Sequence, residues 1–496
     1  ASTTATIECQ ILRTTDGFTT TPTILSLPND TDSRSATYGF TGAQAFYDLF
    51  IESDPVNDAN VYVGGLNIHK STNSGNSWVQ ISEWQSSSSV HSDQHAMTFK
   101  PGNSNVALFG CDGGVYYCSS LSTTNNTSAA IPSRNNGFVT AQMVGVAVMP
   151  NGVSGTSGDF FVTGLQDNGT QYFPSSLSSS LGAAAGMNSS SRTQGGDGGI
   201  PLFAQDSDKY YVSNYVYNDN MNTRNLNGTI IKTLSDGTTD RGLFYPAMVL
   251  NSTNDFVFSD FSGGTTFTPT VRRYGNIKAT GTVTRVDLTN ALLTTYPTAL
   301  QVGKVTKTTL YIGTLNGKLL QVTGSTGASP VWSDITGVNF VGTISDIEFG
   351  ANDSQIFVTI KNYGVTSIWY TKDQGLSWYS IEGNLPDMPV NCILQNPLKS
   401  DELMIGTELG VWYANTFNPN ASEDQSLNWM PSFNGMSNVK VTDLDLQPNL
   451  PVNPTSYNVY AATYGRGVFS GVFNTAVLSK EEFTNNKNVS IYPNPS

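Results

Sequence analysis

The chain has 496 residues, more than one hydrophobic core usually holds, so it is either divided into domains or built from repeats. Only 12% of the residues are charged, while Gly (47 copies) and Tyr, Phe, Ser, Thr and Asn are frequent, which favours short strands joined by turns. The net charge of −14 repels nucleic acids and anionic lipids, and no apolar run approaches the ~20 residues of a membrane helix, so we expect no nucleic-acid partner and no transmembrane segment.

The termini and the cysteines give weaker indications. The chain begins at Ala1 without a Met and without a signal peptide, so we expect a processed N-terminus. Cys9, Cys111, Cys118 and Cys392 allow three disulfide connectivities. Cys111 and Cys118 flank one hairpin and would bridge it if the strand register permits. Four unpaired thiols are the alternative, and the sequence leaves both open.

A strand–Gly–turn–strand phrase recurs along the chain, and successive copies begin roughly 50 residues apart. Another short apolar strand precedes most copies, and a tight Gly turn such as Asn316-Gly317 leads on to a third strand. This spacing and strand content match the blades of a β-propeller, which have four strands in ~40–50 residues. The copies begin at Val61, Ala107, Phe160, Tyr210, Phe256, Thr309, Ile356, Leu403 and Val459.

The sequence therefore predicts an all-β fold, a β-propeller of about nine to ten four-stranded blades within residues 1–473. We interpret ILRTTDG, from Ile11 to Gly17, as the end of a tenth, incomplete module. Because a ring usually holds four to eight blades, we expect two rings, one of them incomplete because upstream sequence is missing. One ring of ten blades is the alternative.

Two segments resemble the Asp-box, S/T-x-D-x-G-x-x-W: STNSGNSW and TKDQGLSW. The second matches at every position, whereas the first has Asn in place of Asp. In such a turn the hydroxyl and carboxylate side chains bond the backbone of a tight hairpin, Gly takes a conformation that other residues resist, and Trp packs between blades. We therefore assign structural roles to Ser71, Asn73, Gly75, Trp78, Thr371, Asp373, Gly375 and Trp378.

The repeat is thus similar to that of the Asp-box (BNR-like) propellers, which include sialidases, sortilin-type receptors with one ten-bladed ring, and xyloglucan-active two-propeller glycosidases. Asp-boxes are structural in all of these proteins, so the resemblance implies a fold and no particular chemistry.

The C-terminus carries a second resemblance. NVSIYPNPS, residues 488–496, is similar to the first strand of the sorting domain of type IX secretion cargo of Bacteroidetes, and residues 474–487 have the polar composition of a linker. The resemblance implies a secreted or cell-surface protein whose tail engages the type IX secretion machinery. An ordinary polar tail is the alternative interpretation.

Strand order predicts which face of the blades carries a site. The loop before the inner strand and the turn between the second and third strands share one face, near the central channel, and the Asp-box turn lies on the other. Polar residues at these positions supply the candidates, although Asp-Gly and Asp-Asn-Gly are favoured turn residues whatever the function, so plain turn chemistry is the alternative, above all for Asp112. The catalytic candidates are Asp93, Asp167 and Asp197, and the ligand-binding candidates are His91, His95, Gln166, Asn168, Glu408 and Arg466.

The run of His91, Asp93 and His95 also raises the possibility of a metal site. In a regular strand the two histidines would lie ~13 Å apart, so three ligands to one ion would need a bulge or a loop. We favour instead that these residues line the channel mouth. No cofactor is expected, apart from a structural metal ion such as calcium.

Two functions remain. We favour a secreted or cell-surface propeller that binds a polysaccharide, a glycoprotein or a partner protein in adhesion or recognition. The alternative is a glycoside hydrolase that acts on a plant-type or other polysaccharide through two carboxylates, ~5.5 Å apart for retention or ~6.5–9.5 Å apart for inversion. No segment matches the catalytic motifs of the xyloglucan-active group. Sialidase activity is not expected, because arginines are few and show no triad pattern.

Overall fold

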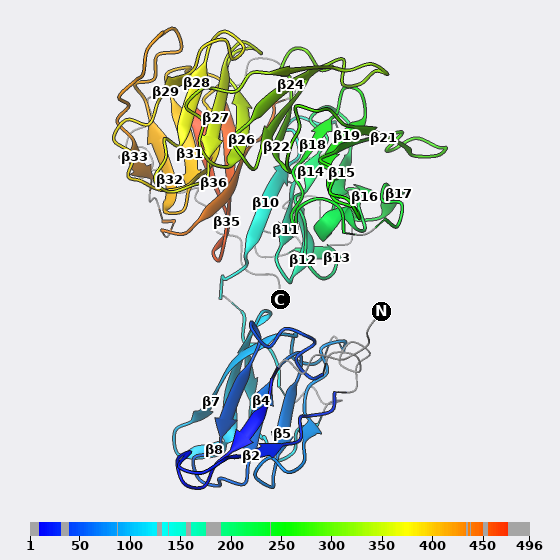
Figure 1. The fold of residues 1–496 in the computed structure, drawn as a ribbon, viewed down its shortest axis with the longest axis vertical. Helices are drawn as coiled ribbons and strands as arrows, with labels where there is room; N and C mark the ends of the chain where they lie inside the picture. Colours follow the sequence, from blue (N-terminus) through cyan, green and yellow to red (C-terminus); the bar gives the residue numbers. More distant parts are fainter. Residues whose placement is uncertain are drawn as a thin grey trace. The chain divides into compact units, whose positions relative to one another are not determined.

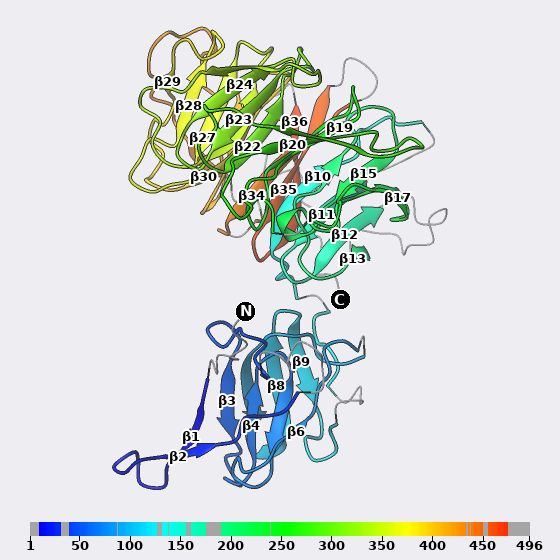
Figure 2. The same ribbon diagram turned by 45° about the vertical axis from the view of Figure 1, so that its right-hand side comes forward.

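Each copy of the repeated phrase folds as the second strand of a small antiparallel sheet, and the strands of every sheet follow one another in chain order. Figures 1 and 2 show the computed structural model of the chain. The chain divides into two compact units, Ala1–Phe138 and Val139–Pro495. The structure describes residues 9–30, 39–86, 88–125, 131–136, 138–154, 160–174, 190–238, 240–432, 435–436, 438–449 and 455–474.

Within its described residues the second unit contains seven successive sheets. Apolar side chains that alternate along the strands are buried between neighbouring sheets, as Phe160, Tyr211 and Val257 are in one shared cluster. The strands of the first four sheets are β10 (Met143–Val148), β11 (Phe160–Leu165), β12 (Gly169–Pro174) and β13 (Ser191–Gln194); β14 (Leu202–Phe203), β15 (Tyr210–Ser213), β16 (Asn222–Asn225) and β17 (Ile230–Thr233); β18 (Met248–Asn251), β19 (Phe256–Asp260), β20 (Val271–Gly275) and β21 (Thr284–Leu288); β22 (Pro297–Val302), β23 (Leu310–Thr314), β24 (Leu319–Thr323) and β25 (Val331–Asp334). The remaining sheets contain β26 (Ile344–Phe349), β27 (Ile356–Ile360), β28 (Ile368–Thr371) and β29 (Tyr379–Ser380); β30 (Val390–Gln395), β31 (Leu403–Thr407), β32 (Gly410–Ala414) and β33 (Met430–Ser432); β34 (Val441–Leu446), β35 (Ser456–Thr463) and β36 (Gly467–Asn474).

The last of these sheets closes a ring against the first. In Figure 1 the orange-red strands β35 and β36 lie beside the cyan strand β10. Phe161 and Tyr460 pack together with ring centroids 5.5 Å apart. The Thr442 hydroxyl donates to the carbonyl of Met143 at 2.9 Å. A closed ring of seven blades confirms the prediction of two rings and excludes one ring of ten.

A β-bulge recurs in the inner strands of this ring, at the same position in five of the sheets that the structure describes. A bulge inserts one unpaired residue and turns its side chain away from the regular alternation. Four of the five bulge residues have a polar side chain that reaches the next inner strand, whose backbone carbonyl accepts its hydrogen bond. These bonds join Thr298 to Ile344 (2.6 Å), Ser345 to Val390 (2.6 Å), Asn391 to Val441 (2.8 Å) and Thr442 to Met143 (2.9 Å).

Carboxylates on the same inner strands make a second set of bonds between blades. Asp443 accepts the N–H of Val146 at 3.0 Å, and Asp445 accepts that of Val148 at 2.7 Å. These acids line a central cavity of about 590 Å³ together with Glu348. Burial in the cavity raises the pKa of Asp443 to about 6 and that of Glu348 to about 7.

The first unit contains three sheets within its described residues, and Figure 2 shows β1 and β2 beside the sheet that begins with β3. Its strands are β1 (Ile11–Arg13) and β2 (Thr23–Leu25); β3 (Phe50–Ser53), β4 (Val61–Gly64), β5 (Ile68–Ser71) and β6 (Val79–Gln80); β7 (Gln94–Lys100), β8 (Asn103–Cys111) and β9 (Gly114–Cys118).

The Asp-box turns have the hydrogen bonds that the motif predicts. The Thr371 hydroxyl accepts the N–H groups of Asp373 and Gly375, at 3.2 and 3.0 Å, and Asp373 accepts the N–H of Ser377 at 2.9 Å. Gly375 has φ +88°, a conformation that suits glycine. The indole N–H of Trp378 donates across to the preceding sheet. In the first Asp-box, Asn73 accepts the N–H of Ser77 at 2.9 Å, so Asn takes the place of Asp without loss of this bond.

A third turn has the same hydrogen bonds without the Gly and Trp of the motif. The Thr14 hydroxyl accepts the N–H groups of Asp16 and Phe18, at 3.2 and 2.9 Å, and Asp16 accepts the N–H of Thr20 at 3.1 Å. Phe18 occupies the glycine position with φ +66°, which is unusual for a bulky residue. This turn joins β1 to β2, as an Asp-box turn joins the third strand of a blade to the fourth.

The two Asp-box tryptophans place β1 and β2 within a blade. Trp378 Nε1 donates to the carbonyl of Ile335, the residue that follows the fourth strand β25, at 2.9 Å. Trp78 Nε1 donates to the carbonyl of Ser26, the residue that follows β2, also at 2.9 Å. The strands β1 and β2 therefore correspond to the third and fourth strands of a blade, in agreement with the interpretation of residues 11–17 as the end of an incomplete module.

The register of the β8–β9 hairpin decides whether Cys111 and Cys118 form a disulfide. Cys111 is opposite Gly114 and Cys118 is opposite Ala107, so the two side chains do not meet, and Cys111, Cys118 and Cys392 are free thiols. The linker and the sorting strand predicted for residues 474–487 and 488–496 lie outside the described residues, apart from Asn474 at the end of β36. In the part of the chain that is described, no helical segment is long and apolar enough to cross a membrane.

Replacement of Trp378 by Ala should lower the free energy of unfolding by about 2–3 kcal/mol, less than the ~3–5 kcal/mol of a fully buried Trp, because this ring is half-buried. It would lose its contact with Phe340, whose centroid is 4.9 Å away, and its bond to Ile335. Denaturant unfolding measures the change. Trp378→Phe keeps most of the packing and should cost only about 1 kcal/mol. Equal stability of Trp378→Ala and the parent would show that the motif does not hold the blades together.

Replacement of Glu348 by Gln should raise the free energy of unfolding at pH 8 by about 1–2 kcal/mol and leave it unchanged at pH 4. Burial raises the pKa of Glu348 in the folded chain, and this effect outweighs the charges of Lys304 and Lys307, which lower it. Asp346 and Asp445 also face the cavity. Protonation of Glu348 therefore contributes its full stabilisation below the ordinary pKa of a glutamate, and this contribution is lost as the pH rises through about 7. Thermal unfolding at both pH values measures the effect, with the exposed Glu423→Gln as the control. Stabilisation by Glu348→Gln at pH 4 as large as at pH 8 would contradict the argument.

Candidate functional site

Strand order brings predicted site residues together within each unit. In the first unit, Asp93 directly precedes β7 and Asp112 lies in the β8–β9 turn, where its N–H donates to the carbonyl of Asp93 at 3.3 Å. In the second unit, Asp167 lies in the β11–β12 turn and Asp197 precedes β14, and the N–H of Asp167 donates to Asp197 Oδ1 at 3.1 Å. The start of the inner strand and the turn after the second strand therefore share a face, as predicted, and each unit has its own group of acids.

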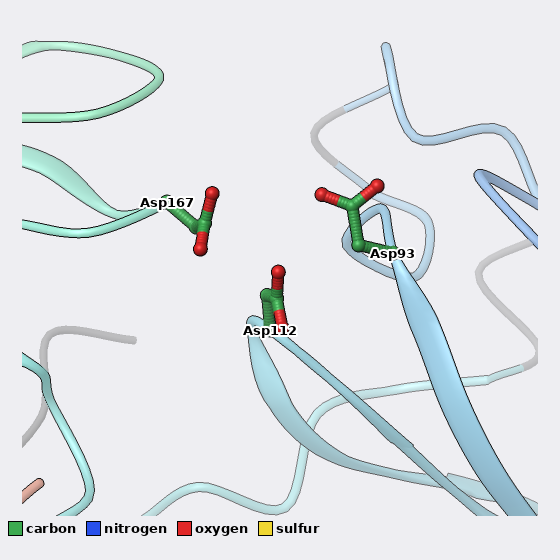
Figure 3. Close-up of side chains that lie close together, drawn as sticks. All are labelled: Asp93, Asp112 and Asp167. Atoms are coloured by element: carbon green, nitrogen blue, oxygen red, sulfur yellow. The ribbon is translucent and has the colours of Figure 1, made fainter. Parts of the chain in front are cut away.

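The first unit holds two of its acids close together. Figure 3 shows the side chains of Asp93 and Asp112, each with a carboxylate oxygen within 4.8 Å of the other; Asp167, drawn in the same figure, belongs to the second unit. Asp93 has φ +65°, a conformation that costs energy in a non-Gly residue. The amide of Gln44 donates to Asp93 Oδ1 at 3.0 Å and fixes the side chain.

A third acid, which the sequence analysis did not single out, lies against this pair. Asp48 is fully buried, with 0% of its surface exposed, and its carboxyl group contacts that of Asp93. Burial, and next the charge of Asp93, raise the pKa of Asp48 to about 8. Asp48 precedes β3 as Asp93 precedes β7, so the positional rule used for Asp93 would have found it.

The environments of Asp93 and Asp112 differ. Burial, and next the negative charge of Asp112, raise the pKa of Asp93. Asp112 accepts hydrogen bonds from the Tyr47 hydroxyl at 3.0 and 3.1 Å and lies 2.6 Å from His95 Nε2. Asp93 is thus the acid of this pair whose surroundings favour the protonated form, whereas Asp112 lies among polar neighbours.

The H-x-D-x-H run contains the bulge that a metal site would need, but its side chains have separate neighbours. The pairing of β7 with β8 skips His95, which reaches Asp112. His91 Nδ1 lies 3.2 Å from the carbonyl of Ser92, and its ring packs against Gly113. Among the described residues, His91, Asp93 and His95 do not form a group whose ligand atoms lie within 4.8 Å of one another. The geometry gives no support to a metal held by these three residues.

The acids of the second unit lie among tyrosines and amides. The Tyr464 hydroxyl donates to Gln166 Oε1, and the backbone N–H of Gln166 donates to the carbonyl of Gln142. Burial, followed by the charge of Asp197, raises the pKa of Tyr245. Tyr245 precedes an inner strand, β18, and is a second residue that the search for charged side chains missed.

The remaining candidates are spread around the same ring. The Asn168 amide donates to the carbonyl of Gln166 at 3.2 Å. Arg466, in the β35–β36 turn, is exposed and donates to the carbonyls of Val139 and Gly465. Glu408, in the β31–β32 turn, forms an ion pair with Lys440 at 3.0 Å. Of the candidates in the second unit, Gln166, Asn168, Asp167 and Asp197 form one group, and Glu408 is paired elsewhere on the ring.

Replacement of Asp112 by Asn should lower the pKa of Asp93, because it removes a negative charge that disfavours ionisation of Asp93. Titration of the side-chain carboxyl carbons by NMR would measure the shift in the intact chain. Asp58→Asn, at an exposed position of the same unit, is the matched control and should leave the Asp93 titration unchanged. An unchanged pKa in Asp112→Asn would show that burial alone sets the proton affinity of Asp93.

Comparison with known proteins supports the fold. No family model matches the chain, and no curated protein matches it. Among solved structures, the chain is similar to the GH74 enzyme of Niastella koreensis, with a TM-score of 0.50 and 16% sequence identity. The match covers 86% of this chain and 60% of that protein, so the chain spans about three fifths of its length. At this identity the likeness shows a shared all-β propeller fold and leaves the chemistry to be argued from the residues.

Proposed function

We propose that the chain is a carbohydrate-active propeller that hydrolyses glycosidic bonds of a polysaccharide, with Asp93 as the proton donor. The observation that carries the proposal is the close pair of carboxyl groups in the first unit, Asp93 and Asp112, in which burial and the charge of Asp112 raise the pKa of Asp93. Glycoside hydrolysis needs an acid that is still protonated near neutral pH to protonate the leaving oxygen. The similar fold of an enzyme named GH74 adds support.

In this mechanism Asp93 donates its proton to the glycosidic oxygen as the bond to the sugar carbon breaks. A second carboxylate either attacks that carbon, to form a glycosyl-enzyme that water then hydrolyses, or takes a proton from the water that attacks the carbon directly. Asp112 contacts His95 and Tyr47, and its charge raises the pKa of Asp93. Within the first unit it is the candidate for the second carboxylate. The buried acid Asp48 contacts the Asp93 side chain from the protein interior.

A propeller that only binds glycans or proteins, the function favoured from the sequence, is now the alternative. A recognition surface has no need for an acid whose pKa is raised beside an ionised neighbour, whereas a hydrolase does. A polysaccharide substrate agrees with the secreted or cell-surface location and with export through the type IX machinery, and both of these stay predictions.

The test is hydrolysis of neutral polysaccharides by the full chain, measured as new reducing ends. Asp93→Asn should lower the rate by about 10²–10⁴-fold. The loss should be much smaller on an aryl glycoside with a good leaving group, because such a group departs without a proton. The rate of the parent should fall as the pH rises through the raised pKa of Asp93, since the unprotonated carboxylate cannot donate.

Asp112→Asn tests Asp112 as the second carboxylate, and it should lower the rate as Asp93→Asn does. A parent that hydrolyses polysaccharide and an Asp93→Asn variant of equal rate would remove Asp93 from the mechanism. A parent that binds glycan with no turnover would establish the recognition role instead.

A further inference from the structure

Two loops of the second and third blades of the ring present aromatic side chains on the face that carries Asp167 and Asp197. One loop joins β15 to β16 and contains the short 3₁₀ helix η1 (Val216–Asn218), and the other precedes β18. Phe244 is 41% exposed and Tyr217 is half-buried. Exposed aromatic rings that the fold holds in place can bind a ligand with little loss of side-chain freedom.

The first loop is held in a strained conformation by buried polar groups. Tyr217 and Asn218 have φ values of +56° and +64°, and such strain clusters at functional sites. Asn218 is only 1% exposed, and its amide donates to the carbonyls of Arg241 and Asp260, at 2.8 and 2.6 Å. The N–H of Tyr217 donates to the carbonyl of Phe244 at 3.1 Å, which ties the two loops together.

The second loop is fixed in a similar way. The buried carboxylate of Asp260 accepts the N–H groups of Leu243 and Ser262, at 2.9 and 3.0 Å. The residue before Phe244 is therefore anchored on the end of β19. The fold keeps Phe244 exposed by a network of buried hydrogen bonds.

The three aromatic rings form a continuous strip. The Tyr217 and Phe244 centroids are 5.4 Å apart with the rings at 87°, and those of Phe244 and Tyr245 are 4.8 Å apart at 77°. The Tyr245 hydroxyl is buried and has no hydrogen-bond partner among the described residues. The charges of Asp197 and Asp167 act on this hydroxyl, so the strip leads from the exposed Phe244 to the acids of the second unit.

We propose that Tyr217, Phe244 and Tyr245 form a stacking subsite for a sugar ring of a neutral polysaccharide. The C–H face of a pyranose packs on the exposed ring of Phe244, and the Tyr217 hydroxyl and Asp197 exchange hydrogen bonds with the sugar hydroxyls. The surrounding acids, which include Asp219 and Asp240, and the net charge of −14 disfavour an anionic glycan. The proposal rests on the proposed function for its substrate class and is independent of the role of Asp93.

The test is affinity electrophoresis of the full chain in gels that contain hydroxyethyl cellulose, xyloglucan or galactomannan, with polygalacturonate as the anionic probe. Phe244→Ala should weaken binding to at least one neutral polymer about tenfold, and Phe244→Tyr should restore it. Tyr363→Ala is the matched control, because Tyr363 is an exposed aromatic residue (65%) in the β27–β28 loop of another blade, and it should bind as the parent does. Melting temperatures close to that of the parent would show that the variants fold.

The outcomes separate this inference from the proposed function. Three outcomes would overturn the inference: the parent binds none of the neutral polymers, Phe244→Ala and Tyr363→Ala weaken binding equally, or polygalacturonate binds as tightly as a neutral polymer. A parent that hydrolyses polysaccharide and a Phe244→Ala variant with unchanged KM would overturn it while the proposed hydrolase stands. Binding that depends on Phe244 without any turnover would support the subsite and remove the hydrolase.

Discussion

Hydrogen bonds between neighbouring inner strands are the constraint on which the rest of the ring depends. A blade of three or four short strands buries too little surface to be stable alone, so its stability comes from its neighbours. The sheets pair strands only within each blade, and the side chains of Thr298, Ser345, Asn391 and Thr442 cross from one blade to the next. These bonds run from β22 through β26, β30 and β34 to β10 and so close the ring, in which the loops before β14 and β18 carry Asp197 and part of the aromatic strip.

The sequence was sufficient to predict the repeat, because one blade needs the same alternation and the same Gly turn in every copy. All nine phrases occupy second strands, and both Asp-boxes have the expected bonds. The bulges could not be predicted, since an extra residue in a strand leaves no mark in its composition. The Asp-box-like turn at Phe18 was not recognised in the sequence for a related reason. Its hydrogen bonds are those of an Asp-box, but Phe18, with a positive φ, takes the place of the Gly by which the motif is identified.

The candidate site was predicted in position more than in chemistry. Strand order correctly indicated that Asp93 and Asp112 share a face, but the sequence could not show that Asp112 contacts Tyr47 and His95 while burial raises the pKa of Asp93. That difference depends on burial and on distances of a few ångströms between separate loops. Asp48 escaped notice because it lies inside an apolar phrase that indicated a strand and nothing more.

The bulge position in the inner strands shows how copies of one module divide their work. In four blades of the ring its occupant is Ser, Thr or Asn, which bonds the next blade, whereas in the sheet of β7 it is His95, which turns to Asp112 within its own sheet. His95 belongs to the first unit, so its departure from the pattern removes no bond from the seven-bladed ring. One structural position can therefore hold neighbouring blades together in one unit and place a side chain beside an acid in the other.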